Sequence, residues 1–213
     1  NPQHTYATAG IYSVSLQVST TPGCSGTSIA NQLITVHSIP TVSVTANQDS
    51  GCAPFSVQFQ SNSTGSTQFN WDFGNGSSST LNNPTHTYTQ SGTFTPTLTV
   101  TSGAGCTAST SIQPAIRVFS PKAFFSGSPL IGCPGMTVNF QHTAASTFIV
   151  QYDWNFGDGN TGSGRNVSHT YTQAGVYSVS LIVTNSFGCK NTVIKNNYVT
   201  VLNPQLTIQN PDT

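Results

Sequence analysis

The sequence predicts an all-β protein built from tandem sandwiches of about seven strands each. Apolar residues alternate with polar ones along short segments, no segment has the periodicity of a helix, and the whole pattern returns about every 82 residues. About 80 residues of short alternating strands, bounded by Gly, Asn, Ser and Pro, suit two packed sheets. Each full repeat is therefore expected to be an immunoglobulin-like β-sandwich.

A His-Thr-Tyr segment marks the repeat, beginning at His4, His86 and His169 with offsets of 82 and 83 residues. On this grid residues 1–37 are the C-terminal half of one module, 38–119 and 120–203 are complete modules, and 204–213 begin a further one. The first three parts are called the first, second and third repeat below. We expect the sequence to belong to a longer array.

Alternating apolar residues mark the expected strands in chain order. Those of the third repeat contain Met136, Val138 and Phe140; Tyr152, Trp154 and Phe156; Tyr177, Val179, Leu181 and Val183; and finally Val199 and Val201. One position departs from the pattern, because the second repeat has Pro96 where the third has Val179. Since proline cannot donate a ladder hydrogen bond, we expect a local break or bulge at Pro96.

Charged residues are almost absent: the chain has 5 Lys and Arg and 5 Asp and Glu among 213 residues. Without a basic cluster it lacks the positive surface that binds nucleic acids or anionic lipids, and no apolar run is long enough to span a bilayer. Nucleic-acid binding and membrane insertion of this segment are not expected. Charge would multiply along an array, so neutral faces rich in hydroxyl groups favour contact between copies.

Two segments of six residues carry a family resemblance. Trp71-Asp72-Phe73-Gly74-Asn75-Gly76 and Trp154-Asn155-Phe156-Gly157-Asp158-Gly159 are each followed by His-Thr-Tyr and then by Gly-x-Phe or Gly-x-Tyr. These motifs resemble the signature of the polycystic kidney disease (PKD) domain, and the resemblance covers the whole chain. The Cys-Ala-Pro at Cys52 and Cys-Pro at Cys133 before the second strand, and the Gly-Cys after the sixth, further resemble the tandem PKD arrays of large secreted cell-surface proteins of Bacteroidota. The resemblance implies an extracellular, non-catalytic β-sandwich.

The motif residues are expected to be structural. Charge sits on Asp72 in the second repeat and on Asp158 in the third, at different positions of the turn, while an Asx side chain occupies both positions each time. A metal ion or an acid–base catalyst needs the carboxylate itself, whereas a turn needs only an Asx side chain. His4, His86 and His169 each lie in a different module, without a second His at ligand spacing nearby, so we expect each to orient the turn into the sixth strand, with Tyr88 or Tyr171 making a bond like that of a tyrosine corner. The residues assigned to this structural motif are Trp71, Asp72, Gly74, Gly76, His86, Tyr88, Gly92, Trp154, Asp158, Gly159, His169, Tyr171 and Gly175.

Five cysteines remain: Cys24, Cys52, Cys106, Cys133 and Cys189. Spacing alone suggests bonds within each module, Cys52 with Cys106 and Cys133 with Cys189. In a sandwich of this class, however, these positions lie at opposite ends of strands about 23 Å long, whereas bonded Cα atoms lie within about 7 Å. We therefore predict that Cys52 pairs with Cys189 between the two complete modules, and that Cys24, Cys106 and Cys133 pair with modules outside this segment or with other chains. Bonds within modules and free thiols remain alternatives.

These features predict an extracellular repeat array that is not an enzyme. We expect it to have no catalytic, metal-binding or cofactor-binding residues and no cofactor. It would serve as a stiff stalk or a filament-forming, adhesive segment of a large bacterial cell-surface protein. Its expected partners are neighbouring modules of the same chain and other copies in a fibre, with a surface glycan or protein ligand left open. The alternative is a set of accessory PKD modules that aid substrate binding by a secreted protease or chitinase.

Overall fold

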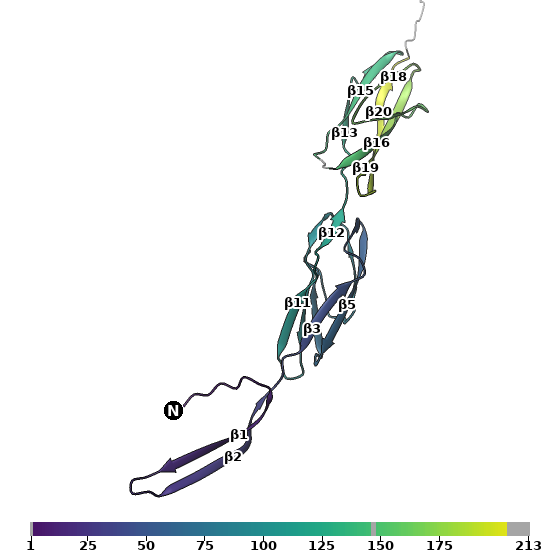
Figure 1. Ribbon diagram of the computed structural model, residues 1–213. Helices are drawn as coiled ribbons and strands as arrows, with labels where there is room; N and C mark the ends of the chain where they lie inside the picture. Colours follow the sequence, from purple (N-terminus) through teal and green to yellow (C-terminus); the bar gives the residue numbers. More distant parts are fainter. Residues whose placement is uncertain (1, 146–147, 204–213) are drawn as a thin grey trace, which may run out of the picture. The chain divides into compact units, whose positions relative to one another are not determined.

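The computed structural model describes residues 2–145 and 148–203, and these ranges contain twenty β-strands and no helix (Figure 1). The all-β fold class is therefore confirmed. The expected start of a further module at 204–213 lies outside the described residues. The described residues form two compact units, one of 2–49, 56–86 and 93–116, the other of 50–55, 87–92, 117–145 and 148–203. Two short segments of the second repeat thus group with the third.

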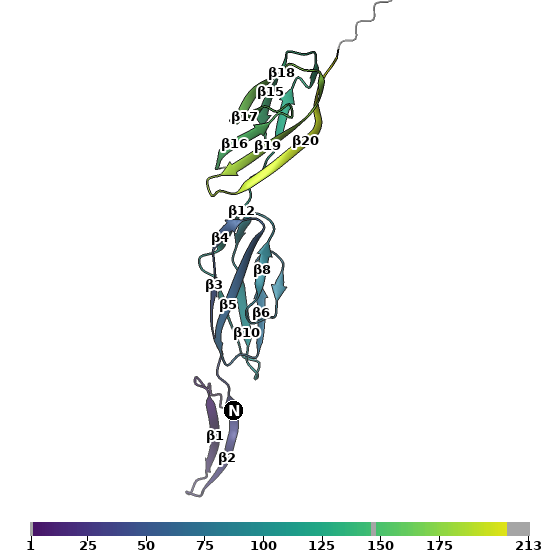
Figure 2. The same cartoon turned by 90° about the vertical axis from the view of Figure 1, so that its right-hand side faces the viewer.

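The third repeat is a sandwich of two sheets. Its strands are β13 (Phe125–Ser128), β14 (Ile131–Gly132), β15 (Met136–His142), β16 (Ile149–Asn155), β17 (Thr161–Ser163), β18 (Asn166–Tyr171), β19 (Gly175–Asn185) and β20 (Lys190–Val201). One sheet has the order β13-β15-β18 and the other β14-β20-β19-β16-β17 (Figure 2). The inward residues of both sheets form one core around Trp154, Phe140 and Leu181. The period-two pattern thus places alternate side chains between the sheets.

The second repeat has the same plan with more interruptions. Its strands are β3 (Thr41–Ala46), β4 (Ser50–Cys52), β5 (Phe55–Thr64), β6 (Gln68–Asp72), β7 (Ser78–Ser79), β8 (Thr85–Tyr88), β9 (Gly92–Phe94), β10 (Thr97–Thr101), β11 (Thr107–Ser111) and β12 (Ile116–Phe119). They form the sheets β3-β5-β8, β11-β10-β6-β7 and β4-β12-β9. The five-stranded sheet of the third repeat therefore corresponds to two smaller sheets here.

The break expected at Pro96 is present, because β9 ends at Phe94 and β10 begins at Thr97. The third repeat is irregular at the same place. Between Tyr177 and Val179 the register between β19 and β20 shifts, and the Asn197 N–H donates to the side chain of Ser178 at 3.1 Å. The ladder is thus already interrupted where the second repeat has proline, which explains why the fold accommodates Pro96.

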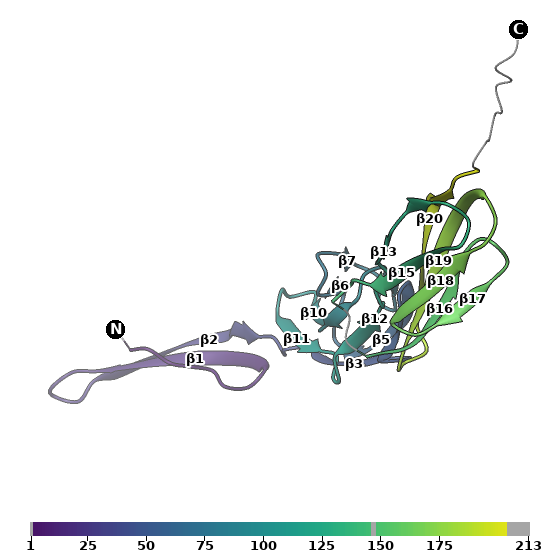
Figure 3. The ribbon, with the colours of Figure 1, turned by 90° about the horizontal axis from the view of Figure 1, so that it is seen from above.

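The first repeat forms one hairpin, β1 (Gly10–Ser19) and β2 (Ser25–Val36), a long two-stranded ribbon (Figure 3). Its register matches that of β19 and β20 pair for pair, including the shift after Tyr12 and the left-handed Gln32 at φ 51°. Its apolar side chains are nevertheless uncovered: Leu16 is 62% exposed, whereas the equivalent Leu181 is 0% exposed. The hairpin therefore adopts the geometry of its repeat without the facing sheet.

This difference predicts unequal costs for the same substitution. Leu181→Ala should lower the free energy of unfolding of the third repeat by about 2 to 5 kcal/mol, because it leaves a cavity in a closed core. Leu16→Ala should cost less than about 0.5 kcal/mol, because its side chain is already in water. Urea unfolding followed by tryptophan fluorescence and by amide exchange in residues 10–36 measures both. Equal costs would show that the face bearing Leu16 is covered.

Candidate functional site

A tight turn follows the buried tryptophan of each complete repeat. In the second repeat the Asp72 carboxylate accepts a hydrogen bond from the Gly74 N–H at 2.8 Å. In the third, the Asn155 side-chain oxygen accepts one from the Gly157 N–H at 2.9 Å. A carboxylate and an amide thus make the same local bond, as expected for an Asx turn.

The second Asx position of the turn behaves in the same way. The side-chain oxygen of Asn75 accepts from the Ser77 N–H at 3.1 Å, and that of Asp158 accepts from the Asn160 N–H at 3.1 Å. These contacts support the structural role given to Asp72 and Asp158. Within the described residues, no three side chains of His, Cys, Asp or Glu gather as they would around a metal ion.

Each turn needs a glycine at its third residue for two reasons. Gly157 has φ +85°, and a Cβ added there would lie 2.3 Å from the Ser178 carbonyl oxygen. Gly74 has φ +76°, and its Cβ would lie 3.2 Å from the Thr95 backbone nitrogen. The turn thus packs against the irregular part of β19 in the third repeat and against the break between β9 and β10 in the second. The remaining turn glycines, Gly76 at φ +86° and Gly159 at φ +93°, have no atom within 4 Å of an added Cβ.

Gly157→Ala and Gly159→Ala therefore form a matched pair of variants. Gly159→Ala should lower the unfolding free energy of the third repeat by about 1 to 2 kcal/mol, through backbone strain alone. Gly157→Ala should cost at least about 1 kcal/mol more, because the added methyl group also meets a backbone carbonyl. Urea unfolding of both variants measures the difference. Equal losses would contradict the packing of this turn against Ser178.

The rings of His86 and His169 pack on this turn. In β18 the His169 ring stacks on Phe156 with centroids 4.1 Å apart, and its Nε2 lies 2.6 Å from an Asp158 carboxylate oxygen. In β8 the His86 ring stacks on Phe73 at 4.2 Å, and its Nε2 lies 3.0 Å from the amide nitrogen of Asn75. The same contact is thus made with a charged partner, Asp158, in the third repeat and with a neutral one, Asn75, in the second.

These partners have different electrostatic consequences. Burial lowers the pKa of His86 from its ordinary value, because the charged ring would lose solvent. Burial acts to raise the pKa of Asp158, but hydrogen bonds from His169 and Asn160 outweigh it and lower that pKa. Burial also raises the pKa of Tyr171, with Asp158 and Tyr177 adding to the effect, so this phenol stays protonated.

The second repeat should lose stability on mild acidification. Since the pKa of His86 is lowered in the folded state, the unfolded chain binds the proton more readily, and stability falls as the pH drops below about 6.5. Asn75→Asp should raise the pKa of His86 and reduce this loss. NMR titration of His86, with urea midpoints between pH 8 and 5, measures both effects.

The matched change in the third repeat is Asp158→Asn, which removes the carboxylate beside His169. Because the pKa of Asp158 is lowered in the folded state, its carboxylate stabilises that state at pH values above the ordinary carboxylate pKa. This contribution is lost as the pH falls through the pKa of the folded state. The Asp158→Asn variant should therefore not show the loss of stability at low pH that this carboxylate causes in the original chain. An unchanged pH profile in both variants would contradict the assigned partners.

The other motif residues are part of the cores. Trp71, Trp154, Tyr88 and Tyr171 are all buried. The Trp154 indole N–H donates to the Gly164 carbonyl at 2.8 Å, and the Trp71 indole N–H to the Asn82 carbonyl at 3.3 Å. The Tyr171 hydroxyl donates to the Phe156 carbonyl at 3.0 Å, tying β18 to the turn. Gly92 and Gly175 are the first residues of β9 and β19.

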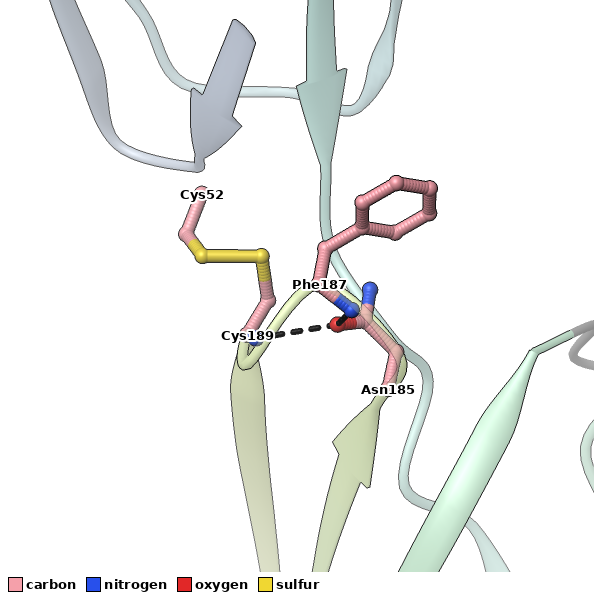
Figure 4. The surroundings of a disulfide bond; sticks show 4 residues. All are labelled: Cys52, Asn185, Phe187 and Cys189. Atoms are coloured by element: carbon pink, nitrogen blue, oxygen red, sulfur yellow. Dashed lines mark hydrogen bonds between the residues drawn. A yellow bond between two sulfur atoms is a disulfide. The ribbon is translucent and has the colours of Figure 1, made fainter.

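The cysteines bring together residues that are remote in the sequence. Cys52 and Cys189 form a disulfide with Cα atoms 5.3 Å apart and a sequence separation of 137, within the second compact unit (Figure 4). This is the pair that the sequence analysis expected. Cys24, Cys106 and Cys133 are free thiols in this chain, so neither bond within a module is formed.

Local structure prepares both ends of this bond. Strand β4 pairs in parallel with β12, which places Cys52 beside Phe119. At the other end, the Asn185 side chain accepts hydrogen bonds from the N–H groups of Phe187 at 3.0 Å and Cys189 at 2.9 Å (Figure 4). These two hydrogen bonds hold the shape of the turn that carries Cys189.

A second contact accompanies the disulfide. The rings of Phe119 and Phe187 stack with centroids 3.8 Å apart and an angle of 8° between their planes. Sequence reasoning missed this pair, although Phe187 stands two residues before the cysteine and Phe119 is the last residue of its strand. The site therefore consists of a covalent bond and an aromatic contact from the same two segments.

The comparisons with known proteins agree with the motifs. The model of the PKD domain family matches residues 37–117 and 119–201. The chain belongs to the PKD domain family. The Cys52–Cys189 bond thus joins residues of two successive PKD domains, and the site residues described above lie within them. Among the described residues, no helix is long and apolar enough to cross a membrane.

Relatives with PKD domains include proteins of Vibrio, one of them a metalloprotease. The chain is 33% identical over 125 residues to the pre-pro-metalloprotease PrtV of Vibrio cholerae, an alignment that takes in 58% of this chain but only 13% of PrtV. Among solved structures, the PKD1 domain of PrtV shares 33% identity, covering 39% of this chain and 98% of that domain, with a TM-score of 0.34. The PKD1 domain of Vibrio anguillarum Epp shares 32% identity over the same fractions, also with a TM-score of 0.34.

Proposed function

We propose that these PKD domains are a non-catalytic structural segment of a large extracellular protein, which they extend as a stiff stalk or filament-forming array. The observation that carries this proposal is the Cys52–Cys189 disulfide between successive domains. A bond of this kind limits the motion of one domain against the next, and disulfides persist in oxidising, extracellular surroundings. The setting proposed is the bacterial cell surface, in a protein of the type that Bacteroidota secrete.

The composition supports the same role. The chain carries almost no charge, so repeated copies would not repel one another. The side chains that a catalytic reading would use, Asp72, Asp158 and His169, are engaged in turns and ring stacking. In this proposal the polar faces of the domains serve adhesion to other copies or to a surface ligand.

The test is whether the two complete domains tumble together. ¹⁵N relaxation is measured on the chain with Cys24, Cys106 and Cys133 changed to Ser, which leaves only the Cys52–Cys189 bond. In the oxidised form both domains should report one rotational correlation time, and after reduction the two values should separate and fall. Independent tumbling in the oxidised form would overturn the stiff-stalk proposal.

The relation to PrtV favours one second candidate, in which these domains are accessory modules of a secreted hydrolase and aid its binding to substrate. Sedimentation of the chain with insoluble chitin or gelatin tests this role. Saturable retention on either material, abolished by unfolding the domains, would favour the accessory role. No retention above that on cellulose would count against it.

A further inference from the structure

Asn75 is the one asparagine in this sequence that is followed by glycine. An asparagine loses ammonia when the backbone nitrogen of the next residue attacks its side-chain amide carbon, and a glycine there has no side chain to hinder the attack. Asn75 and Gly76 are both exposed, so water reaches them. A Cβ added at Gly76 would have no atom within 4 Å. The attacking residue is therefore open to solvent and unhindered.

The folded turn holds the Asn75 amide at both of its ends. Its oxygen accepts a hydrogen bond from the Ser77 N–H at 3.1 Å, and its nitrogen lies 3.0 Å from the Nε2 of His86. The His86 ring is fixed by its stack on Phe73, with centroids 4.2 Å apart. A donor on the amide oxygen stabilises the negative charge that an attack on the carbon develops there. The turn thus places a donor at the oxygen and a titratable ring at the nitrogen that would leave.

The third repeat has the product of such a reaction at the same position. There Asp158 stands in place of Asn75, and its carboxylate accepts from the Asn160 N–H at 3.1 Å and lies 2.6 Å from the Nε2 of His169. These are the same two contacts that the Asn75 amide makes. An aspartate formed at position 75 therefore fits the turn as it stands.

We propose that Asn75 is a site of self-catalysed deamidation, in which Gly76 supplies the nucleophile, His86 protonates the leaving ammonia, and water supplies the oxygen of the new carboxylate. In the amide, the nitrogen only donates hydrogen bonds. Once the attack has made the side-chain carbon tetrahedral, that nitrogen is a basic amine within reach of His86. A histidine in this place acts as a general acid for the departure of ammonia.

The reaction balances with water alone. The Gly76 nitrogen bonds to the side-chain carbon of Asn75 and gives its proton to water. His86 protonates the amide nitrogen, the bond between that nitrogen and the carbon breaks, ammonia leaves a succinimide ring, and His86 regains a proton from water. Water then adds to the side-chain carbonyl of the ring, the bond to the Gly76 nitrogen breaks, and a proton returns to this nitrogen. An amide and one water thus give a carboxylate and ammonium, and nothing is oxidised or reduced.

Deamidation adds one negative charge to a chain whose formal net charge is +0. It also places a carboxylate beside His86, which favours the charged form of the ring. The inference goes beyond the proposed function, because it concerns the chemistry of a single turn and does not depend on whether the domains form a stalk.

The test is incubation of the chain at neutral pH in water enriched in ¹⁸O, followed by mass spectrometry of the peptides that contain Asn75 and Asn155. Asn155 is the internal control, because its oxygen accepts from the Gly157 N–H at 2.9 Å but Phe156 follows it. Asn75 should become aspartate with one ¹⁸O, while Asn155 remains an amide. Fragmentation that separates aspartate from isoaspartate should show mainly aspartate, because Ser77 and His86 direct water to the side-chain carbonyl.

The same incubation in urea gives the rate of the unfolded chain. If Asn75 stays an amide in the folded chain over the time that converts it in urea, the proposal is overturned. Isoaspartate as the main product of the folded chain would overturn it as well.

His86→Phe tests the proton donor, since phenylalanine retains a ring to stack on Phe73. This variant should slow deamidation of the folded chain at least about tenfold and leave the rate in urea unchanged. His86→Gln, which retains a hydrogen-bonding side chain but no group that titrates near neutral pH, should be equally slow. The control is His37→Phe at an exposed histidine, which should leave the rate unchanged. Trp71 fluorescence verifies that each variant is folded, and equal rates in the His86 and His37 variants would contradict the role of His86.

Discussion

Cys52→Ser should lower the unfolding free energy of the third repeat by about 3 to 5 kcal/mol. Cys52 and Cys189 are 137 residues apart in sequence, so the bond closes a long loop and restricts the unfolded chain strongly. Cys52 is exposed, so a serine hydroxyl there stays in water. The change therefore removes the bond without burying a polar group.

The tryptophans allow this effect to be assigned to one domain. Each complete repeat has one, Trp71 and Trp154, so a Trp71→Phe background reports only the third repeat during urea unfolding. Cys133→Ser is the control and should leave the transition unchanged, because Cys133 is unbonded in the monomer. Equal transitions with and without Cys52 would show that the disulfide does not stabilise the domain.

Trp154→Ala should cost the third repeat about 3 to 5 kcal/mol, enough to unfold it in a large fraction of molecules. The indole lies between the two sheets, with its ring centroid 5.1 Å from that of Phe125 and 5.6 Å from that of Phe140. Its loss opens a large cavity and leaves the Gly164 carbonyl without its donor.

Amide exchange measured by mass spectrometry tests this change, since the variant lacks its fluorescent reporter. Peptides from β15, β16 and β19 should lose protection, while those of the second repeat keep theirs. Phe124→Ala is the control, because Phe124 is next to Phe125 but 57% exposed, and should cost less than about 0.5 kcal/mol. Loss of protection in both repeats together would show that they unfold as one unit.

Patterns of neighbouring residues predicted the features that depend on a single strand or turn. Alternation placed Val179, Leu181 and Trp154 inward because side chains point to opposite faces at every second residue. The shape of the Asx turns also follows from adjacent residues. The exchange of charge between Asp72 and Asp158 therefore sufficed to predict their structural role.

Apart from the Cys52–Cys189 bond, the contacts between remote segments were not predicted. The stack of Phe119 on Phe187 depends on the parallel register of β4 with β12, which no local pattern encodes. The bulge was expected only at Pro96, although the hairpins of the other two repeats have it as well. Alternation continues through Tyr177 and Val179 because the additional residues lie on the partner strand β20.

The histidines show the same limit. Nothing in the sequence around His86 or His169 indicates that the ring meets a turn eleven residues earlier. That contact requires β8 and β18 to lie over the Trp-Asx-Phe-Gly segment, which is a property of the packed sheets. The expected role of these residues was structural, but the partner that each ring contacts was not predicted.

The most direct test of the inter-domain link is disulfide mapping of the unreduced chain by mass spectrometry. Trypsin alone leaves Cys24, Cys52 and Cys106 in one fragment, residues 1–117, so a second cleavage after leucine and aromatic residues, at Leu33 and Phe55, is needed to separate them. The expected result is a linked pair of peptides containing Cys52 and Cys189. A Cys52–Cys106 or Cys133–Cys189 peptide, or both thiols of the predicted pair free, would contradict a covalent link between successive PKD domains.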